Sequence, residues 1–341
     1  MVRAGVIGYG FMGSTHANAY KAMANAELAC VIDVEADKRQ KAASEQGVKT
    51  YATMAEAFDA EALDILDVCL PTYQHADAAV EALGAGKNVM CEKPMALTAA
   101  DCQRMIDAAK AADRKLMVAH VLRFWPEYVK LREVVTSGKY GKPVSMVCTR
   151  VGSAPMWSWD GWLMDGKRSG GALIDLHVHD IDWTACMCGR PKAVYASGST
   201  FSKGTGFAHV YAQYLYDDVM ALAEGGWDMQ PGWGFVMACR VVCENGVIEY
   251  GSNLSPALRV YTEGEPEAIE VPQVQVEGSA GEGGNISSLG GYFLECRYFV
   301  DCVTKGAYPT VVTPQDAKQN IEIAEAEIES IETGKIVEMP A

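Results

Sequence analysis

Alternation between strand-like and helix-like segments constrains the fold of this chain more than any other feature. Over the first 120 residues, short apolar runs such as RAGVIGYG, ELACVIDV and LDILDVCLPT alternate with longer alanine-rich stretches such as QHADAAVEALGAG. Short parallel strands joined by helices need helices on both faces of one sheet. The alternation therefore predicts a doubly wound α/β (Rossmann) domain.

The pattern changes beyond residue 144, where segments such as VSMVCTRVG and HVYAQYLY follow one another through short turns. This order is typical of an open, mostly antiparallel sheet. We predict a Rossmann domain over residues 1–122 and an α+β domain over 123–341, whose last helix can pack back on the first domain. The glycine-rich stretch 276–291 is expected to be one long loop.

Composition excludes several classes of protein. The net charge of −15 argues against nucleic acid or an anionic membrane as a partner. No apolar run approaches the ~20 residues of a membrane span, and the first ten residues read as a strand rather than a signal peptide. The 11 cysteines contain no CxxC pair, so we interpret them as reduced core thiols. A cytoplasmic protein is expected.

The stretch GYGFMG fits the pattern G-x-G-x-x-G, with Gly8, Gly10 and Gly13 between a predicted strand and a predicted helix. In that pattern the first glycine permits a tight turn, the second lets a pyrophosphate approach, and the third lets the helix pack closely. The helix N-terminus then faces the phosphates. We expect this loop, with Phe11 and Met12, to bind a dinucleotide; the alternative is an ordinary glycine turn.

Asp33 ends the second predicted strand, 20 residues past Gly13. A carboxylate there accepts hydrogen bonds from ribose hydroxyls and repels a 2′-phosphate. The nearest basic residues are Lys38 and Arg39, not an immediate neighbour. NAD is therefore favoured over NADP, with a solvated aspartate at a strand end as the alternative.

Glu92-Lys93-Pro94 lies at the carboxyl end of a predicted strand, the edge where doubly wound sheets bind ligands. A lysine there has three donors and a pKa that is readily tuned, so it can bind a substrate oxygen. The alternative is a surface lysine in a strand-to-helix turn.

The stretch SGGALIDLHVHDIDW places three carboxylates and two histidines within eight positions. If it is one helix, Asp175 and His179 share a face one turn apart, as an acid/base pair would require. Asp182 could support His179, and Asp180 is expected to be solvated. Two histidines at i and i+2 converge on one ion best from a strand, so no metal is expected at His177 and His179. A solvated helix turn is a further alternative.

Taken as a whole, the chain resembles the Gfo/Idh/MocA family of NAD(P)-dependent oxidoreductases. The resemblance rests on five segments in the family's order, among them GYGFMGSTHANAY, GKNVMCEKPMALT and SGGALIDLHVHDID. It implies a Rossmann domain followed by an open-sheet domain that carries substrate determinants and often an oligomer interface. A homodimer or homotetramer that acts on a sugar or polyol is therefore expected.

The resemblance also assigns roles to individual residues. Lys93 would be the catalytic lysine, His179 the acid/base, and Asp175 a substrate-hydroxyl ligand. The cofactor would be bound by Gly8, Gly10, Gly13, Asp33, Pro71, Thr72, His75, Glu92 and Lys93.

Five further residues are candidates for the substrate pocket. His177 stands where the family usually has a small residue, and His120 ends a strand that should face the pocket. Trp162, Arg123 and Tyr292 are pocket candidates as well. For each of the five, a packed or hydrogen-bonded structural role is the alternative.

The predicted function is hydride transfer between the nicotinamide of NAD and a secondary alcohol or ketone of a sugar, inositol or sugar derivative. A first alternative is an enzyme that recycles NAD while it cleaves a glycoside or epimerises a sugar. A second is a non-catalytic nucleotide sensor or scaffold.

Overall fold

The computed structural model describes residues 1–200, 204–272, 274, 276 and 289–340. Contacts divide the chain into two compact units, residues 1–124 with 274–318 and residues 125–273 with 319–341. The first unit thus includes a segment that lies beyond the predicted boundary at residue 122. The predicted loop 276–291 falls mostly outside the described residues, and its last two positions, Gly290 and Gly291, are helical instead, because α10 (Gly290–Lys305) begins there. Each unit is described by itself below.

The first unit contains a six-stranded parallel sheet in the order β3-β2-β1-β4-β5-β6. Because the strand order reverses beside β1, the sheet is doubly wound, and its ligand crevice is expected at the carboxyl ends of β1 and β4. This confirms the predicted Rossmann architecture. The strands are β1 (Val2–Ile7), β2 (Ala26–Ile32), β3 (Lys49–Tyr51), β4 (Ile65–Val68), β5 (Asn88–Glu92) and β6 (Leu116–Ala119).

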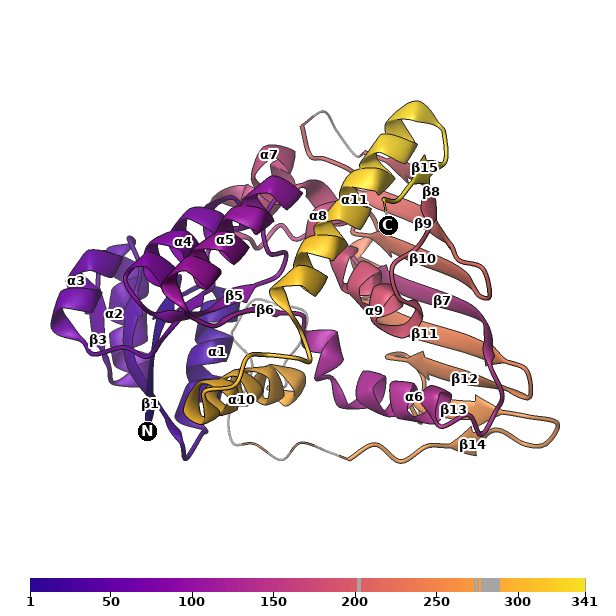
Figure 1. Ribbon diagram of the computed structural model, residues 1–341, viewed down its shortest axis with the longest axis horizontal. Coiled ribbons are helices and arrows are strands. Elements are labelled where there is room, and N and C mark those ends of the chain that lie inside the picture. Colours follow the sequence, from indigo (N-terminus) through magenta and orange to yellow (C-terminus); the bar gives the residue numbers. More distant parts are fainter. Residues whose placement is uncertain (201–203, 273, 275, 277–288, 341) are drawn as a thin grey trace. The chain divides into compact units, whose positions relative to one another are not determined.

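Helices connect these strands on both faces of the sheet, because right-handed crossovers that run in opposite directions from β1 reach opposite faces. Figure 1 shows α4 and α5 side by side over one face, and α1 beside α10. Helix α2 ends at Gly47, whose left-handed φ of 70° lets it cap the helix C-terminus. The helices are α1 (Phe11–Lys21), α2 (Ala36–Gln46), α3 (Met54–Ala60), α4 (His75–Gly84), α5 (Ala99–Ala112) and α10 (Gly290–Lys305).

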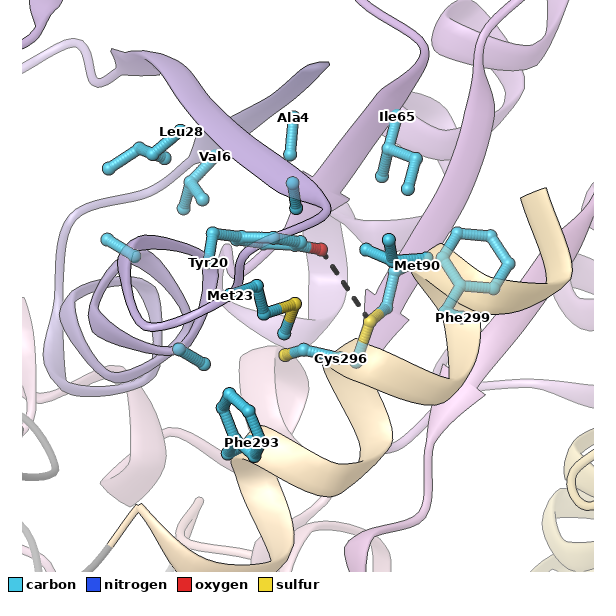
Figure 2. Close-up of a cluster of buried hydrophobic side chains, with 14 of the residues drawn as sticks. Ala4, Val6, Tyr20, Met23, Leu28, Ile65, Met90, Phe293, Cys296 and Phe299 are labelled. Carbon is cyan, nitrogen blue, oxygen red and sulfur yellow. Dashed lines mark hydrogen bonds between the residues drawn. The ribbon is translucent and has the colours of Figure 1, made fainter. Parts of the chain in front are cut away.

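The core of the first unit joins segments that are far apart in the sequence. Figure 2 shows Cys296 and Phe299 of α10 across from Tyr20 of α1 and Met90 of β5, with the Tyr20 hydroxyl directed at the Met90 sulfur. All four side chains are fully buried. Burying each large apolar side chain contributes about 1.5–3 kcal/mol, so α10 belongs to the folding unit of the Rossmann sheet.

The second unit contains a nine-stranded sheet in the order β14-β13-β12-β11-β7-β10-β9-β8-β15. Among the described strand pairs of this sheet, only β7 and β10 are parallel, which confirms a mostly antiparallel sheet. The strands are β7 (Pro143–Val151), β8 (Ala193–Ser199), β9 (His209–Leu215), β10 (Met220–Gly226), β11 (Val236–Cys243), β12 (Gly246–Gly251), β13 (Leu258–Tyr261), β14 (Glu267–Ala268) and β15 (Val337–Glu338).

Several helices pack against this sheet, among them α6 on β12, α8 on β9 and β10, and α9 on β7 and β10. These three are α6 (Pro126–Thr136), α8 (Gly171–Asp175) and α9 (Val178–Cys188); the short α7 (Gly166–Ser169) precedes α8, and α11 (Pro314–Thr333) is divided between the two units. Within the described ranges, no helix is both long and apolar enough to cross a membrane.

Candidate functional site

The glycine loop connects β1 to α1 as the sequence predicts. Gly8 has a φ of +89°, and a Cβ atom there would lie 2.6 Å from the carbonyl oxygen of Cys69. A Cβ atom on Gly13 would lie 1.8 Å from the carbonyl oxygen of Gly8, so the helix can approach the strand only with glycine at this position. Gly10 is exposed with open space around its Cα, and no side chain caps the helix there. The loop therefore fits the pyrophosphate of a dinucleotide.

Asp33 follows β2 beside this loop. Its Oδ2 accepts a hydrogen bond from the backbone N–H of Tyr9 at 2.7 Å, which ties the carboxylate to the glycine turn. Arg39 also reaches this place, because its Nη1 donates to the carbonyl oxygens of Asp33 at 2.7 Å and Val34 at 2.9 Å. The separation of Arg39 from Asp33 along the sequence is therefore no argument against a basic group near the ribose. The preference for NAD over NADP rests on the Asp33 carboxylate alone.

The loop after β4 carries Pro71, Thr72 and His75. His75 is 1% exposed, and its ring nitrogens lie 2.9 Å from the carbonyl oxygen of Pro94 and 2.7 Å from that of Leu70. Burial lowers the pKa of His75, against the opposing effect of these two carbonyls. The side chain thus links two loops at the carboxyl ends of β4 and β5, an arrangement that favours a role in shaping the predicted cofactor site.

Glu92 ends β5, and its carboxylate is held inside the unit. Oε2 accepts a hydrogen bond from the backbone N–H of Lys93 at 3.0 Å, and Oε1 lies 3.1 Å from Nε2 of His16. Lys93 itself is partly buried. The carboxylate therefore anchors the backbone that carries the predicted catalytic lysine.

His16 is the centre of a buried cluster that the sequence analysis missed. Its side chain is fully buried, with Nδ1 at 2.9 Å from Oδ2 of Asp67 and Nε2 at 3.8 Å from Oε1 of Glu295. Tyr20 donates to the same Asp67 oxygen at 2.9 Å. One signal could have pointed to these residues: Asp67 stands inside the apolar strand LDILDVCLP, and Glu295 inside the apolar helix YFLECRYF.

The segment 171–187 does not form the single helix considered above, because α8 ends at Asp175 and α9 begins at Val178. Both Leu176 and His177 donate their backbone N–H to the carbonyl oxygen of Ala172, at 3.0 and 2.8 Å. The second bond spans five residues, as in a π-bulge, and such insertions are frequent at functional sites. Ordinary i, i+4 spacing therefore does not relate Asp175 to His179; both side chains are partly buried.

His177 is a core residue of the second unit. Its Nε2 lies 3.3 Å from the Tyr214 hydroxyl and 3.3 Å from Oε2 of Glu327, and all three side chains are buried. Burial by itself would lower the pKa of His177, but the negative charge of Glu327 raises it above its ordinary value. These contacts favour the structural alternative over a substrate role.

Asp180 is not solvated, contrary to the prediction. It is fully buried and forms an ion pair with Arg150, whose Nε and Nη2 lie 2.8 and 3.3 Å from its two oxygens. Asp182 is also fully buried, and its Oδ1 accepts a hydrogen bond from Nδ2 of Asn320 at 2.8 Å. Interior partners, rather than solvent, hold both carboxylates of this segment.

The other pocket candidates are held by packing or hydrogen bonds. Arg123 donates to the carbonyl oxygen of Val311 at 3.0 Å, and Trp162 packs on a small cluster around Trp227. His120 and Tyr292 are 1% and 7% exposed. Their substrate roles stay predictions.

The three predicted catalytic residues are distributed over the two units. Lys93 belongs to the first, and Asp175 and His179 belong to the second. Two groups of metal-ligand type occur among the described residues, and both contain His16 rather than His177 or His179. One is His16 with Asp67 and Cys296, and the other is His16 with Glu92 and Glu295.

The doubly wound sheet, the glycine loop and Asp33 together define a dinucleotide-binding Rossmann protein. Two family models match the chain: the oxidoreductase family with an NAD-binding Rossmann fold over residues 2–120, and the Gfo/Idh/MocA C-terminal domain over residues 128–249. The chain belongs to the Gfo/Idh/MocA oxidoreductases. This membership confirms the predicted family and its NAD-binding fold.

Curated relatives carry related names. The chain is 34% identical over 201 residues to a myo-inositol 2-dehydrogenase of Thermotoga maritima, a match that spans 58% of each protein. It is 25% identical over 350 residues to an inositol 2-dehydrogenase of Salmonella typhimurium, which covers 100% of this chain and 98% of the relative.

Solved structures share the fold over the whole chain. A levoglucosan dehydrogenase in complex with NADH and levoglucosan has a TM-score of 0.86 at 22% identity, covering 100% of both chains. A probable dehydrogenase from Thermotoga maritima has a TM-score of 0.81 at 24% identity, covering 99% of this chain and 98% of that one.

Proposed function

We propose that this protein is an NAD-dependent oxidoreductase that transfers a hydride between nicotinamide and a secondary alcohol or ketone of a sugar, inositol or sugar derivative. The observation that carries the proposal is the glycine loop with Asp33 in a chain of this family. The relatives named as inositol 2-dehydrogenases, and the structural neighbour named as a levoglucosan dehydrogenase, support the substrate class.

The proposed chemistry uses three residues of this chain. Hydride leaves a carbinol carbon only as its hydroxyl proton departs, so a base must reach that oxygen. We assign this role to His179, because histidine is the side chain best suited to exchange a proton near neutral pH. Lys93 would stabilise the developing negative charge on oxygen, and Asp175 would orient a substrate hydroxyl. Bound NAD would accept or supply the hydride.

A screen of polyols and sugars with NAD tests the proposal. NADH formation on at least one of them is expected, and Lys93→Met and His179→Asn should each lower kcat by about 100- to 10,000-fold. Lys110→Met, in the last turn of α5, is the matched control and should leave kcat unchanged. Unchanged turnover in both site variants would overturn the assignment of roles.

The same screen separates the alternatives. Product from a cleaved or epimerised sugar without net NADH would support the NAD-recycling enzyme. Tight NADH binding with no turnover on any compound would support the non-catalytic alternative.

A cytoplasmic homodimer or homotetramer is part of the proposal. Support for assembly comes from the second sheet, where Tyr195, Tyr211 and Leu222 on neighbouring strands are about half exposed, at 44%, 56% and 46%. Light scattering on the purified protein would measure the oligomeric state.

A further inference from the structure

The cluster around His16 contains more negative groups than one histidine can neutralise. Asp67, Glu92 and Glu295 all lie within 4 Å of the His16 ring nitrogens, and all are buried. A buried charge without a partner costs several kcal/mol. An imidazolium can bridge two carboxylates through its two N–H groups, so the third carboxyl group must be neutral or hold another cation.

Hydrogen bonds identify which carboxyl group is neutral. Asp67 accepts from His16 Nδ1, from the Tyr20 hydroxyl and from the Cys69 thiol, at 2.9, 2.9 and 3.5 Å. Glu92 accepts from the Lys93 backbone and forms the ion pair with His16. Neither oxygen of Glu295 has a hydrogen-bond partner among the described residues. Donors stabilise the charged form of a carboxyl group, so the proton belongs on Glu295.

The pKa directions agree with this assignment. Burial by itself would lower the pKa of His16, but the charge and hydrogen bond of Asp67, together with Cys296 and Cys69, raise the pKa well above its ordinary value. Burial would raise the pKa of Glu92, whereas His16 brings it below its ordinary value. Burial raises the pKa of Glu295 well above its ordinary value, with Glu92 and Asp67 adding to the effect and His16 opposing it.

The cluster touches the predicted catalytic lysine through one residue. His16 Nε2 lies 3.1 Å from one Glu92 oxygen, and the other Glu92 oxygen accepts from the Lys93 backbone at 3.0 Å. His16 itself lies on α1, the helix that the glycine loop opens. A charged His16 therefore fixes Glu92, and Glu92 fixes the backbone of Lys93.

We propose that His16 is a positioning residue for Lys93, acting as an imidazolium between Asp67 and Glu92 while Glu295 stays a neutral carboxylic acid. The role for Lys93 rests on the proposed function; the protonation of Glu295 does not. The competing occupant is a metal ion on His16 Nε2, Glu92 and Glu295, because a metal-ligating histidine also donates its other N–H to a carboxylate.

Infrared difference spectroscopy tests the proton on Glu295 without any substrate. Glu295→Gln should remove one protonated-carboxyl C=O band that shifts in D₂O, and the purified wild type should contain no stoichiometric metal. The variant should also keep its stability, because glutamine resembles the neutral acid. An unchanged spectrum, or one metal ion per chain that Glu295→Gln releases, would overturn the proposal.

Steady-state kinetics test the positioning. His16→Gln should lower kcat about 10- to 100-fold, with little change in the Kd of NADH and in the KM of the polyol. Tyr20→Phe is the matched control, since the Tyr20 hydroxyl donates to the same Asp67 oxygen and is directed at the Met90 sulfur rather than at Glu92. It should lower stability and leave kcat unchanged.

Glu92→Ala provides the second variant, because it removes the link to Lys93 and leaves the His16–Asp67 pair balanced. It should reproduce the loss in kcat even where His16→Gln does not fold. A rise in the Kd of NADH with kcat unchanged would assign Glu92 to the cofactor and overturn the proposal. Absence of turnover in the wild type would instead count against the proposed function, and the infrared result would still decide the state of Glu295.

Discussion

Each unit of this protein contains a fully buried histidine beside carboxylates, and the clusters around His16 and His177 differ in their charge balance. In the second unit, His177 faces Glu327 and the nearby Asp180 pairs with Arg150, so each of these acids has a cation. In the first unit, His16 alone faces three carboxyl groups. The balanced cluster needs no proton beyond that of its histidine. The unbalanced one must hold an extra proton and adjoins Lys93.

The largest loss of stability is expected when the buried ion pair between Asp180 and Arg150 is broken. Asp180→Asn leaves Arg150 charged and buried, and breaking such a pair costs about 3–5 kcal/mol of unfolding free energy. Urea denaturation of the variant measures this loss. Asp160→Asn, which changes an exposed partner of Arg168, is the control and should cost little. Equal losses in the two variants would contradict the distinction between buried and exposed pairs.

A smaller loss of stability, which depends on pH, is expected when His177 is replaced. His177→Gln should cost about 1–3 kcal/mol at acidic pH, since it leaves Glu327 without its charged partner. The folded-state pKa of His177 is raised, so the contribution is complete below the unfolded pKa of about 6.5 and is lost as pH rises through the folded pKa.

The wild type should therefore lose its stability advantage over His177→Gln as the pH increases. Tyr214→Phe removes a neighbouring hydroxyl. It should change the stability by the same amount at every pH over which the contribution of His177 is lost. A change in the KM of the polyol with stability unaffected would instead return His177 to the substrate pocket.

The smallest loss of stability is expected for Asp67→Asn, the corresponding change in the cluster around His16. Asp67→Asn keeps an acceptor oxygen for Tyr20 and removes one of the two charged carboxylates, which allows Glu295 to ionise beside His16. We expect a loss of about 1 kcal/mol, measured by urea denaturation beside Asp180→Asn. A loss as large as that of Asp180→Asn would show that the two clusters are balanced in the same way.

Features that depend on local sequence were predictable. The glycine loop follows from spacing, because Gly8 and Gly13 are required by contacts within one strand–turn–helix unit. The doubly wound sheet and the open second sheet follow from the strand–helix alternation and from its change after residue 144, together with the family resemblance. The proximity of Arg39 to Asp33 was missed, since one turn of α2 brings together residues that are six positions apart.

Features that depend on partners distant in the sequence were not predictable. The sequence pattern predicted a solvated Asp180, whereas its ion pair with Arg150 on β7 holds this side chain in the core. His16 stands in a recognised motif, yet its partners come from β4, β5 and α10, up to 279 positions away. Hydrophobic period and motif spacing thus determined the two folds and the dinucleotide loop. Which titratable groups are buried, and which share a proton, was decided only by tertiary packing, because a charge in the interior is set by neighbours that the chain brings together on folding.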